Sequence, residues 1–530
     1  MKIISINAKD YEEKYHVHSL LAKLLKVSEL DESFIFELLK EGYELSTSSD
    51  ECVKKACKRI LEAKDNNEKI FVVGDYDADG ICAASIMKIL LDKLCIENDY
   101  YIPNRFTDGY GLNEDIVLKA KDNNSDLIIT VDNGVKALDA INKTKELGMD
   151  IIITDHHTIE EELKDVLVVH PNYMSEEYEY LCGAGVALEI SRYLIGDDER
   201  SIALAAIASI ADVMVLSKET REIVKAGLEI IKKKIPYSIY ALNNGGEIDY
   251  ETIGFQIAPK LNCVGRLADK ADVNVMPEYL ISDSHIYIDD ISREINNFNE
   301  ERKELQRIQV NKAKELMNDD PFIIVADESF HEGVNGIVAG RLCEEFNRPS
   351  LVMSIKDNIY KGSARSIEGI NLIELFKDNE YVEGGGHKSA AGYSVKKEDF
   401  KAFYDKCQSD TKGLLDNITV KEKEYIELGL NDLTIQNIKE LSRIEPKPKQ
   451  LSNIKYAISA RKVNRVFDNE SIVKFMIGAN SEAVLFKNSE YYKNNGFNGL
   501  KDNEYLLGRL TLNEYKGNIR VQLIVEGIGE

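Results

Sequence analysis

The sequence predicts an α/β protein with a parallel sheet, a long bridging helix, a second α/β unit and a small C-terminal barrel. Three observations lead to this prediction. From about residue 68, short continuous apolar runs alternate with helical patterns, residues 285–317 form a charged helical stretch with few breakers, and short alternating segments follow residue 450. Continuous apolar runs are typical of strands that are buried on both faces, as in parallel sheets.

The elements of the first half follow this pattern. Residues 1–45 have a helical apolar pattern and are predicted to form a helical N-terminal segment. Strands are predicted at 69–74, 127–131 and 151–154, and helices at 81–94, at 135–147 and within 183–233. The charged helix at 285–317 is long enough to bridge two domains.

The second half contains two further units. The second α/β unit has predicted strands at 321–326 and 351–354, helices at 337–346 and 397–413, and a glycine-rich loop at 383–392. Pro446 and Pro448 mark a linker. Beyond it, alternating segments at 454–459, 471–477, 504–512 and 520–525 predict a small antiparallel barrel.

The composition is that of a globular protein, with 44% hydrophobic and 30% charged residues among 530. The longest apolar stretch, 202–211, is shorter than the roughly 20 residues that cross a bilayer. The N-terminus becomes charged before an apolar core of signal length appears. The eight cysteines are scattered without zinc-type spacing, as expected of reduced thiols. We therefore expect a cytoplasmic protein with no membrane partner.

The charge is unevenly distributed. The net charge of −25, from 67 basic and 92 acidic residues, argues against nucleic-acid binding over the whole surface. Residues 421–530, however, hold 17 basic and 15 acidic residues. Seven of the basic residues lie within 441–470: Arg443, Lys447, Lys449, Lys455, Arg461, Lys462 and Arg465. The acidity lies in the first 420 residues, and clustered carboxylates are what hard divalent cations require.

Three acidic clusters come directly after predicted parallel strands. They are Asp75, Asp77 and Asp79 in GDYDADG, Asp132 in TVDNG, and Asp155, His156 and His157 in TDHH. Ligand sites of open α/β sheets lie at the carboxyl ends of the strands, so the clusters can converge in one crevice. A fourth acid, Asp212, ends the apolar segment 202–212 and would need a partner there. A pair of divalent cations removes the repulsion between packed carboxylates and provides a reaction centre.

Each cluster has a simpler interpretation when it is taken alone. An aspartate after a strand is more often a helix N-cap or a turn residue, and Asp-Asn-Gly is usually a turn. An isolated Asp-His-His is also more often structural. The occurrence of all three clusters in order, each at a strand end, favours the metal site.

These motifs, in this order and spacing, resemble those of the DHH phosphoesterase superfamily, and GGGHKSAAG at 384–392 resembles the signature of its associated C-terminal domain. More narrowly, seven segments resemble the RecJ-type single-stranded-DNA-specific 5′-exonucleases: PNRFTDGYGL (103–112), HPN (170–172), AGVALEI (184–190), IASIADVMVL (207–216), KLNCVGRL (260–267), HEGVNGIVAGRL (331–342) and KGSARS (361–366). The resemblance covers about 68–410. It implies a DHH catalytic domain at 46–280, a bridging helix at 281–319, a DHH-associated domain at 320–414 and an OB-fold nucleic-acid-binding domain at 415–530.

The resemblance also implies two catalytic cations, Mn²⁺ or Mg²⁺. The family's ligand pattern corresponds to Asp77, Asp79, Asp132, His156 and Asp212, with Asp132 bridging both ions. Asp75 and Asp155 would be outer-shell groups. His157, His387 and Asp132 would form the catalytic group, with His157 facing the scissile phosphate. A mixed carboxylate and imidazole set suits Mn²⁺ at least as well as Mg²⁺.

Substrate recognition is assigned by the same resemblance. Arg105, Arg266, Ser363 and Arg365 would bind the 5′-terminal phosphate, together with Gly385 and Gly386. Consecutive glycines let the backbone approach a phosphate closely. Taken singly, each arginine is more typical of a surface ion pair, and the glycine segment could be a tight turn with a buried histidine.

The C-terminal domain would hold the single strand. Basic residues at 443–465 interleave with Tyr456, Phe467 and Phe475, a mixture that follows phosphates and stacks bases. About half of such aromatics are expected in a barrel core instead.

The sequence therefore predicts a metal-dependent exonuclease that degrades single-stranded DNA from 5′ to 3′ to 5′-mononucleotides, in recombination and repair. One alternative is a DHH phosphodiesterase for short oligoribonucleotides or cyclic dinucleotides, which would lack the long helix and the terminal barrel. Another is a catalytically inactive replication scaffold, which would have lost metal ligands. Helicase or single-strand-binding-protein partners, the metal used and the oligomeric state stay open.

Overall fold

The chain forms two units. The computed structural model describes all residues except Met1, Asn244, Asp378, 416–422, Asn453 and Lys516. One unit consists of Met1–Leu45, Val215–Lys225 and Val420–Glu530, and the other of Ser46–Met214 and Ala226–Thr419. The helical segment 1–45 thus belongs to the same unit as the C-terminal region, whereas most of the predicted catalytic, bridging and associated domains lie in the other. The boundaries between these domains stay a prediction.

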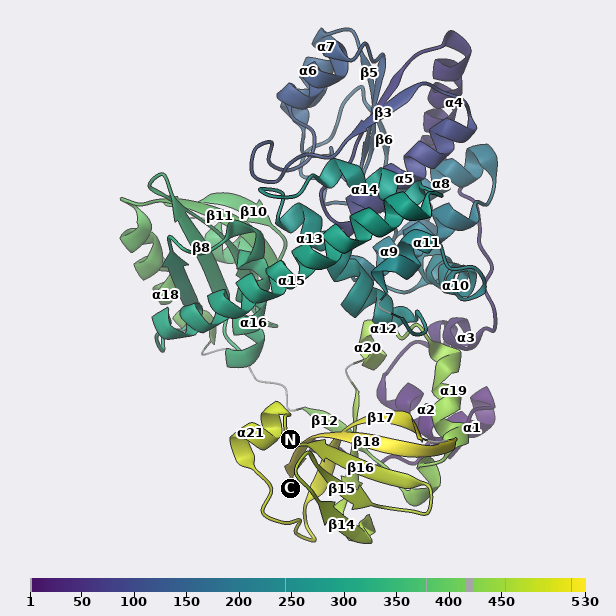
Figure 1. The fold of residues 1–530 in the computed structure, drawn as a ribbon, viewed down its shortest axis with the longest axis vertical. Helices are drawn as coiled ribbons and strands as arrows, with labels where there is room; N and C mark the ends of the chain where they lie inside the picture. The colour runs from purple at the N-terminus through teal and green to yellow at the C-terminus, as the bar shows by residue number, and fades with distance from the viewer. Residues whose placement is uncertain (1, 244, 378, 416–422, 453, 516) are drawn as a thin grey trace. The chain divides into compact units, whose positions relative to one another are not determined.

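The second unit contains the predicted parallel sheet (Figure 1). Its strands are β2 (Ile70–Val73), β3 (Asn98–Tyr101), β4 (Leu127–Val131), β5 (Asp150–Thr154) and β6 (Leu167–Val169). Their order is β3-β2-β4-β5-β6, and every pair is parallel. Strands β2 and β4 are buried along their whole length, which confirms the interpretation of the continuous apolar runs. The carboxyl ends of β2, β4 and β5 therefore lie side by side.

Some helices of this unit pack on the sheet and others pack on those helices. They are α4 (Glu51–Asn66), α5 (Ala78–Lys93), α6 (Glu114–Asp122), α7 (Leu138–Glu146), α8 (Gly183–Ile195), α9 (Glu199–Ala211), α10 (Lys218–Lys233), α11 (Tyr237–Leu242), α12 (Tyr250–Thr252), the π-helical turn η3 (Ile253–Ile257), α13 (Ala258–Arg266) and α14 (Met276–Ile281). Helix α10 begins in the first unit. Helix α5 packs against both α8 and α9. Helix α9 is packed among other helices, and all its residues from Ser201 to Ile210 are buried. This burial explains its continuous apolar sequence.

The long helix α15 (His285–Leu316) confirms the bridging prediction (Figure 1). It packs against α13 at one end and against α16 (Asn335–Phe346) at the other. Its buried residues form one stripe, so the remaining surface is free to carry the many charged side chains seen in the sequence.

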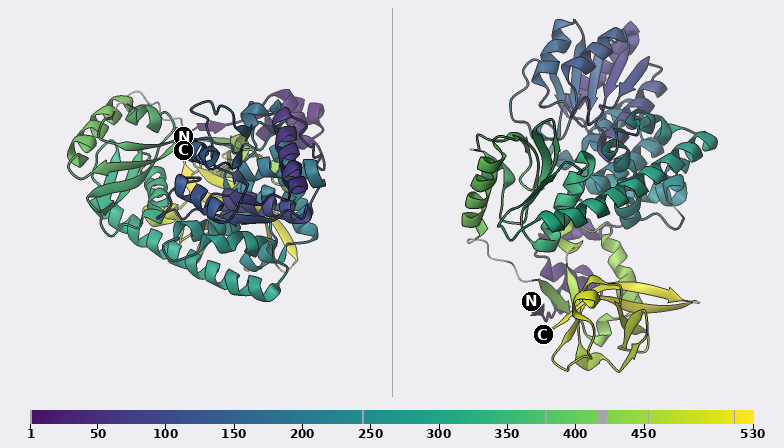
Figure 2. Two further views of the ribbon diagram at one scale, coloured as in Figure 1. Left: turned by 90° about the horizontal axis from the view of Figure 1, so that it is seen from above. Right: turned by 60° about the vertical axis from the view of Figure 1, so that its left-hand side comes forward.

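The second α/β part forms a smaller mixed sheet of order β10-β11-β9-β8-β7. Its strands are β7 (Ile323–Asp327), β8 (Ser350–Lys356), β9 (Ile359–Arg365), β10 (Glu383–Gly386) and β11 (Ala390–Lys396), and its further helices are α17 (Leu372–Phe376) and α18 (Phe400–Leu415). Helix α18 lies along one face of this sheet and α16 along the other (Figure 2). Side chains of α16 form part of the core on that second face. The prediction of a glycine-rich loop at 383–392 was wrong, because β10 and β11 pair there as an antiparallel hairpin.

The first unit contains an eight-stranded sheet of order β1-β12-β13-β17-β18-β16-β15-β14. Its strands are β1 (Lys2–Ile4), β12 (Glu424–Glu427), β13 (Lys455–Ser459), β14 (Arg465–Asp468), β15 (Ile472–Met476), β16 (Ser481–Phe486), β17 (Tyr505–Tyr515) and β18 (Asn518–Gly529). Its helices include α1 (Lys9–Tyr15), α2 (Ser19–Val27), α3 (Glu32–Leu39), α19 (Ile435–Glu440), α20 (Lys449–Ser452) and α21 (Glu490–Asn495).

The sheet of the first unit is not purely antiparallel, so that part of the prediction was wrong. The β1–β12, β12–β13 and β16–β18 pairs are parallel. The N-terminal segment is part of this unit, since β1 pairs with β12 and the buried leucines of α2 join a core with Ile426 and Leu428. The strand-rich C-terminal region is confirmed, and its assignment as an OB fold stays a prediction. No described helix is long and apolar enough to span a membrane.

Candidate metal centre and phosphate pocket

The three acidic clusters converge at the carboxyl ends of β2, β4 and β5. Two groups of three side chains have ligand atoms that all lie within 4.8 Å of one another. One group is Asp75, Asp77 and Asp132, and the other is Asp79, His156 and Asp212. The second group includes Asp212 because α9 ends directly before it. The sequence-based expectation that these clusters share one crevice is confirmed.

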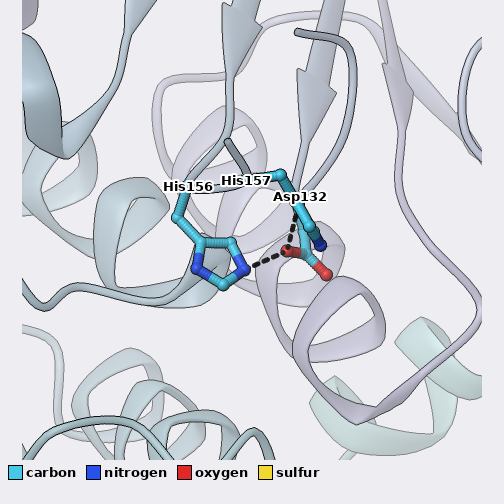
Figure 3. A group of neighbouring side chains, drawn as sticks. All are labelled: Asp132, His156 and His157. Atoms are coloured by element: carbon cyan, nitrogen blue, oxygen red, sulfur yellow. Dashed lines mark ion pairs between the residues drawn. The ribbon is translucent and has the colours of Figure 1, made fainter. Parts of the chain in front are cut away.

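Asp132 belongs to the first group and also forms a third group of this kind with His156 and His157. Its Oδ1 atom is 3.1 Å from His156 Nε2 and 3.9 Å from His157 Nδ1 (Figure 3). His156 Nε2 is also 3.6 Å from Asp79 Oδ2. The Asp132 backbone has a φ of 63°, a left-handed conformation that aspartate tolerates better than most residues. The position of Asp132 suits a ligand shared by two ions.

The donor set fits divalent cations. Burial, together with the negative charges of Asp79 and Asp77, raises the pKa of Asp132 well above its usual range. Burial and Asp79 likewise raise the pKa of Asp212 to about 8. Within the described chain, Asp75 Oδ1 and Asp132 Oδ1 are buried without a hydrogen-bond partner. Buried carboxylate oxygens that lack partners are costly unless they coordinate a cation, and carboxylate with imidazole is a suitable ligand set.

His156 and Asp155 have different roles in this geometry. Burial lowers the pKa of His156, which keeps its ring neutral and able to act as a ligand. Asp155 has both oxygens occupied: Oδ1 accepts from His156 N (2.7 Å), His157 N (3.1 Å) and His157 Nδ1 (2.8 Å), and Oδ2 accepts from Val135 N (3.0 Å). Asp155 therefore orients His157, which favours the predicted outer-shell role. Asp75, with its unpartnered oxygen, lies where a direct ligand would.

The backbone holds the ligands in place. Asp77 Oδ1 caps α5 by accepting from Asp79 N (2.9 Å) and Gly80 N (3.2 Å). Asp79 caps α8 by accepting from Gly183 N and Ala184 N, each at 2.7 Å. A Cβ atom at Gly183 would lie 2.4 Å from the Asp132 Cβ, so only glycine allows this approach. Sequence reasoning missed Gly183 as a site residue, although it directly precedes the AGVALEI segment.

The two predicted catalytic histidines face each other from different domains. The rings of His157 and His387 are 6.2 Å apart and nearly parallel, with an interplanar angle of 19°. Burial by itself would lower the pKa of His157, but its hydrogen bond to Asp155 and the negative charges of Asp155, Asp75 and Asp212 together raise the pKa overall. Tyr110, which was not predicted, donates to the Asp132 carbonyl at 3.2 Å and has its ring edge-on to His157. A group between His157 and His387 would thus be in reach of both imidazoles.

Three predicted arginines gather beside this centre. Burial and the nearby guanidinium groups of Arg105 and Arg365 lower the pKa of Arg266 to about 10. Burial and Arg105 also lower the pKa of Arg365. Among the described residues, none of the three forms an ion pair with a carboxylate. Partly buried guanidinium groups that repel one another are an arrangement that favours binding of an anion.

Ser363 joins the three arginines, and we call Arg105, Arg266, Ser363 and Arg365 the candidate phosphate pocket. A Cβ at Gly336 would lie 3.0 Å from Arg365 Nη2 and 3.5 Å from Ser363 Oγ, so both groups meet at the first turn of α16. Arg105 and Ser363 also line a cavity of about 300 Å³. The arginines come from both α/β parts of the second unit, and the structure thus brings the four predicted residues together.

The close approach of the two hairpin strands also explains why glycine is present there. A Cβ at Gly384 would lie 2.1 Å from the Gly392 carbonyl oxygen, and one at Gly386 would lie 2.5 Å from that of Ala390. These two glycines are therefore required by close cross-strand approach. Gly385 faces open space, and its role at a phosphate, like that of Gly386, stays a prediction.

The comparisons with known proteins agree with this geometry. The DHH family, N-terminal domain, matches residues 69–217, and the DHHA1 domain matches residues 319–412. The chain is 34% identical to the single-stranded-DNA-specific exonuclease RecJ of Bacillus subtilis (strain 168), an alignment that covers 98% of this chain and 69% of that protein. The chain belongs to the RecJ family. It is also 27% identical to the RecJ of Escherichia coli (strain K12), over 90% of each chain.

Solved RecJ structures share the fold. RecJ from Thermus thermophilus, in complex with Mn²⁺, has a TM-score of 0.86 at 24% identity and covers 100% of this chain and 79% of that one. A second structure, an exonuclease RecJ bound to manganese, has a TM-score of 0.63 at 28% identity and covers 71% of this chain and 99% of that one. The fold prediction for the two α/β domains and the bridging helix is therefore confirmed.

Proposed function

We propose that this chain is a two-metal-ion phosphodiesterase that degrades single-stranded DNA from 5′ to 3′ to 5′-mononucleotides, in recombination and repair. One observation carries the proposal: two adjacent ligand groups lie beside a pocket of three arginines without carboxylate partners in the described chain. Membership of the RecJ family supports the same activity. The Mn²⁺ bound to a RecJ structure supports Mn²⁺ or Mg²⁺ as the cofactor.

Each residue has a role in this proposal. The residues that would hold the cations are Asp77, Asp79, Asp132, His156 and Asp212, and Asp75 would join Asp77 and Asp132. The cations supply Lewis-acid activation of water and neutralise charge at the phosphate. His157, oriented by Asp155, and His387 lie close enough together to donate hydrogen bonds to the same phosphate.

The phosphate pocket gives the reaction its direction. Arg105, Arg266 and Arg365, with Ser363, hold the terminal phosphate. Gly384 and Gly392 of the glycine hairpin line the same cavity as Arg105 and Ser363, and contact of Gly385 and Gly386 with a phosphate stays a prediction. A terminal phosphate carries a charge that an internal one lacks, so the pocket selects an end. A 5′-phosphate bound there would bring the first scissile bond toward the residues that would hold the metals.

The test uses purified protein with 5′- and 3′-labelled single strands. We expect mononucleotides to be released first from the 5′ label, with Mn²⁺ or Mg²⁺ and not with chelator, because the ligand groups are built for cations. Release from the 3′ label first, or undiminished cleavage in chelator, would contradict the proposal. Release of mononucleotides from the 5′ end of long DNA single strands would also distinguish this function from that of a phosphodiesterase for short oligoribonucleotides. A complete ligand set disfavours an inactive scaffold.

In the C-terminal region, only some of the predicted DNA-binding residues are exposed and without a carboxylate partner. Tyr456 and Phe475 are buried core residues, so only Phe467 of the three predicted aromatics is exposed. Several basic residues are paired with carboxylates: Lys447 with Glu445, Lys455 with Glu526, Lys462 with Glu427, and Arg443 with Glu440. Arg465 instead stacks on Phe467, 4.4 Å from the ring centroid, on the edge strand β14. An exposed aromatic beside an arginine is a suitable contact for single strands.

Substituting Arg461 and Arg465 together by alanine is expected to weaken binding of long single strands several-fold. The slope of log K against log salt should fall by about 1.4, since each lost phosphate contact contributes about 0.7 for single strands. Fluorescence anisotropy over a salt series measures both. Lys455→Ala, which removes a lysine already paired with Glu526, is the matched control. An unchanged salt slope in the double variant would show that this edge does not hold DNA. A truncation after residue 415 is a poorer test, because it would expose the leucines of α2.

The cytoplasmic location and any helicase or single-strand-binding-protein partner stay predictions. They rest on the sequence and on the repair role proposed above.

A further inference from the structure

One face of the helix that contains η3 and α13 stays partly open along its length. Between Ile257 and Arg266, the residues that keep partial exposure are Pro259, Asn262 and Arg266, and the others are buried. Phe255 continues this face toward the N-terminus. The spacing of four, three and four residues places Phe255, Pro259, Asn262 and Arg266 in one row.

Two members of this row lie in the site already described. Arg266, at the C-terminal end of the row, belongs to the phosphate pocket. Asn262 Oδ1 accepts from Ala78 N at 2.8 Å, between the candidate ligands Asp77 and Asp79. Counted from Arg266, the row therefore passes first the terminal-phosphate pocket and then the metal centre.

Phe255 is the N-terminal end of the row, and the residue is 81% exposed. It lies in η3, which packs against the end of α9. A Cβ at the neighbouring Gly254 would lie 3.6 Å from Ile210 Cγ2, two residues before Asp212. Val213, directly after Asp212, is 71% exposed and has a φ of 55°, an unfavourable backbone conformation for a β-branched residue. Short π-helical turns are frequent at functional sites.

Within the described chain, the Phe255 ring has no aromatic or cationic partner. An isolated, largely exposed phenyl ring costs free energy in water unless a ligand covers it. A nucleobase is the ligand that the row favours, because the other members of the row lie at the phosphate pocket and the metal centre. Every base has a π-face that can stack on such a ring without sequence preference.

We propose that Phe255 is a positioning residue on which a base of the single strand stacks, beyond the scissile bond from the terminal phosphate. The inference rests on the proposed function. The 11 residues from Phe255 to Arg266 correspond to about 16 Å of helix. A stacked strand advances about 3.4 Å per nucleotide and an extended one about twice that, which places the stacked base about two to five nucleotides from the 5′ end. Because both faces of a base are covered in a duplex, this contact requires a single strand at that position.

The first measurement is binding in chelator, where no cleavage occurs. A series of 5′-phosphorylated single strands carries one abasic site at each of the first six positions. For wild type, we expect one position within the second to fifth nucleotides at which the abasic site weakens binding about 5- to 30-fold, the scale of one stacking contact. Phe255→Ala should weaken binding of the intact strand by a similar factor. In Phe255→Ala, the abasic site at that position should cause no further loss of affinity. The substitution has already removed the stacking contact, so removing the base removes nothing more.

Matched variants separate stacking from general apolarity and from folding. Phe255→Tyr keeps an aromatic face and should retain wild-type binding and the abasic profile, whereas Phe255→Leu should resemble Phe255→Ala. Ile286→Ala, at a residue that is 78% exposed near the start of α15, should leave binding unchanged. With metal present, Phe255→Ala should raise KM for strands of six or more nucleotides while kcat on a dinucleotide stays unchanged.

Two outcomes would overturn the inference. In one, Phe255→Ala binds and cleaves long strands as wild type does. A protein partner, rather than a base, would then be what covers the Phe255 ring. In the other, the variant keeps the full abasic profile of wild type. Failure of the proposed function itself is distinguishable, because wild type would then neither bind single strands in chelator nor release mononucleotides from the 5′ end with metal.

Discussion

Asp132→Ala is expected to lower kcat on single-stranded DNA by at least about 100-fold, the loss typical for removal of a key electrostatic element. Asp132 lies within ligand distance of members of both groups, so its removal disturbs both candidate ion sites at once. The fold should persist, since the variant removes a buried carboxylate whose Oδ1 atom has no hydrogen-bond partner within the described chain. The release of labelled mononucleotides with Mn²⁺ measures the change.

A second measurement tests metal binding itself. Wild type should melt at a higher temperature when Mn²⁺ is added, since a ligand that binds the folded state stabilises it, and Asp132→Ala should lose most of this shift. Asp126→Ala is the matched control, because Asp126 precedes the same strand, β4, at the opposite edge of the sheet. It should keep both the activity and the Mn²⁺ shift. Turnover by Asp132→Ala above about a hundredth of wild type would rule out a ligand shared by both ions.

The metal centre could be predicted from the sequence because strand ends fix positions. In a parallel sheet the residues after paired strands meet at one edge, so Asp75, Asp132 and Asp155 had to converge once β2, β4 and β5 were recognised. The role of Asp75 was harder to predict. Its free oxygen and its distance to Asp77 and Asp132 depend on how the loop before α5 folds, which no residue pattern reveals.

The first unit was the least predictable part of the fold. Strand β1 has only three residues, and its partner β12 lies 422 positions away, so no local periodicity indicates the pairing. The glycine-rich segment was predicted as a loop because glycine disfavours strands in general. The hairpin uses glycine where β10 and β11 approach too closely for a Cβ.

The charge pattern of the C-terminal region was also only partly informative. A count of basic residues cannot show that Lys455 and Lys462 are already paired with Glu526 and Glu427, which are distant in the sequence. The exposure of Phe467 and the burial of Phe475 likewise depend on which face of the sheet each strand presents.

Arg365→Ala is expected to reduce the preference for 5′-phosphorylated over 5′-hydroxyl strands by about 10- to 100-fold. That is the scale of one hydrogen bond to a charged group, about 1.5–3 kcal/mol. Arg365 is close to Ser363 and Arg266, is mostly buried, and has no carboxylate partner within the described chain, so its charge is available to a terminal phosphate. Initial rates on a matched pair of substrates that differ only in the 5′ group measure the preference.

Two further variants make the Arg365 prediction specific to the pocket. Arg365→Lys keeps the positive charge but not the planar fork that grips two phosphate oxygens, so its preference should lie between those of wild type and Arg365→Ala. Arg341→Ala removes an exposed arginine from α16 and should keep the full preference. Because the metal ligands are untouched, Arg365→Ala should still need Mn²⁺ or Mg²⁺ and still cut 5′-hydroxyl strands at the wild-type rate. If wild type cuts both substrates equally, or if Arg365→Ala prefers the phosphorylated strand as strongly as wild type, the arginine pocket does not set the polarity of the reaction.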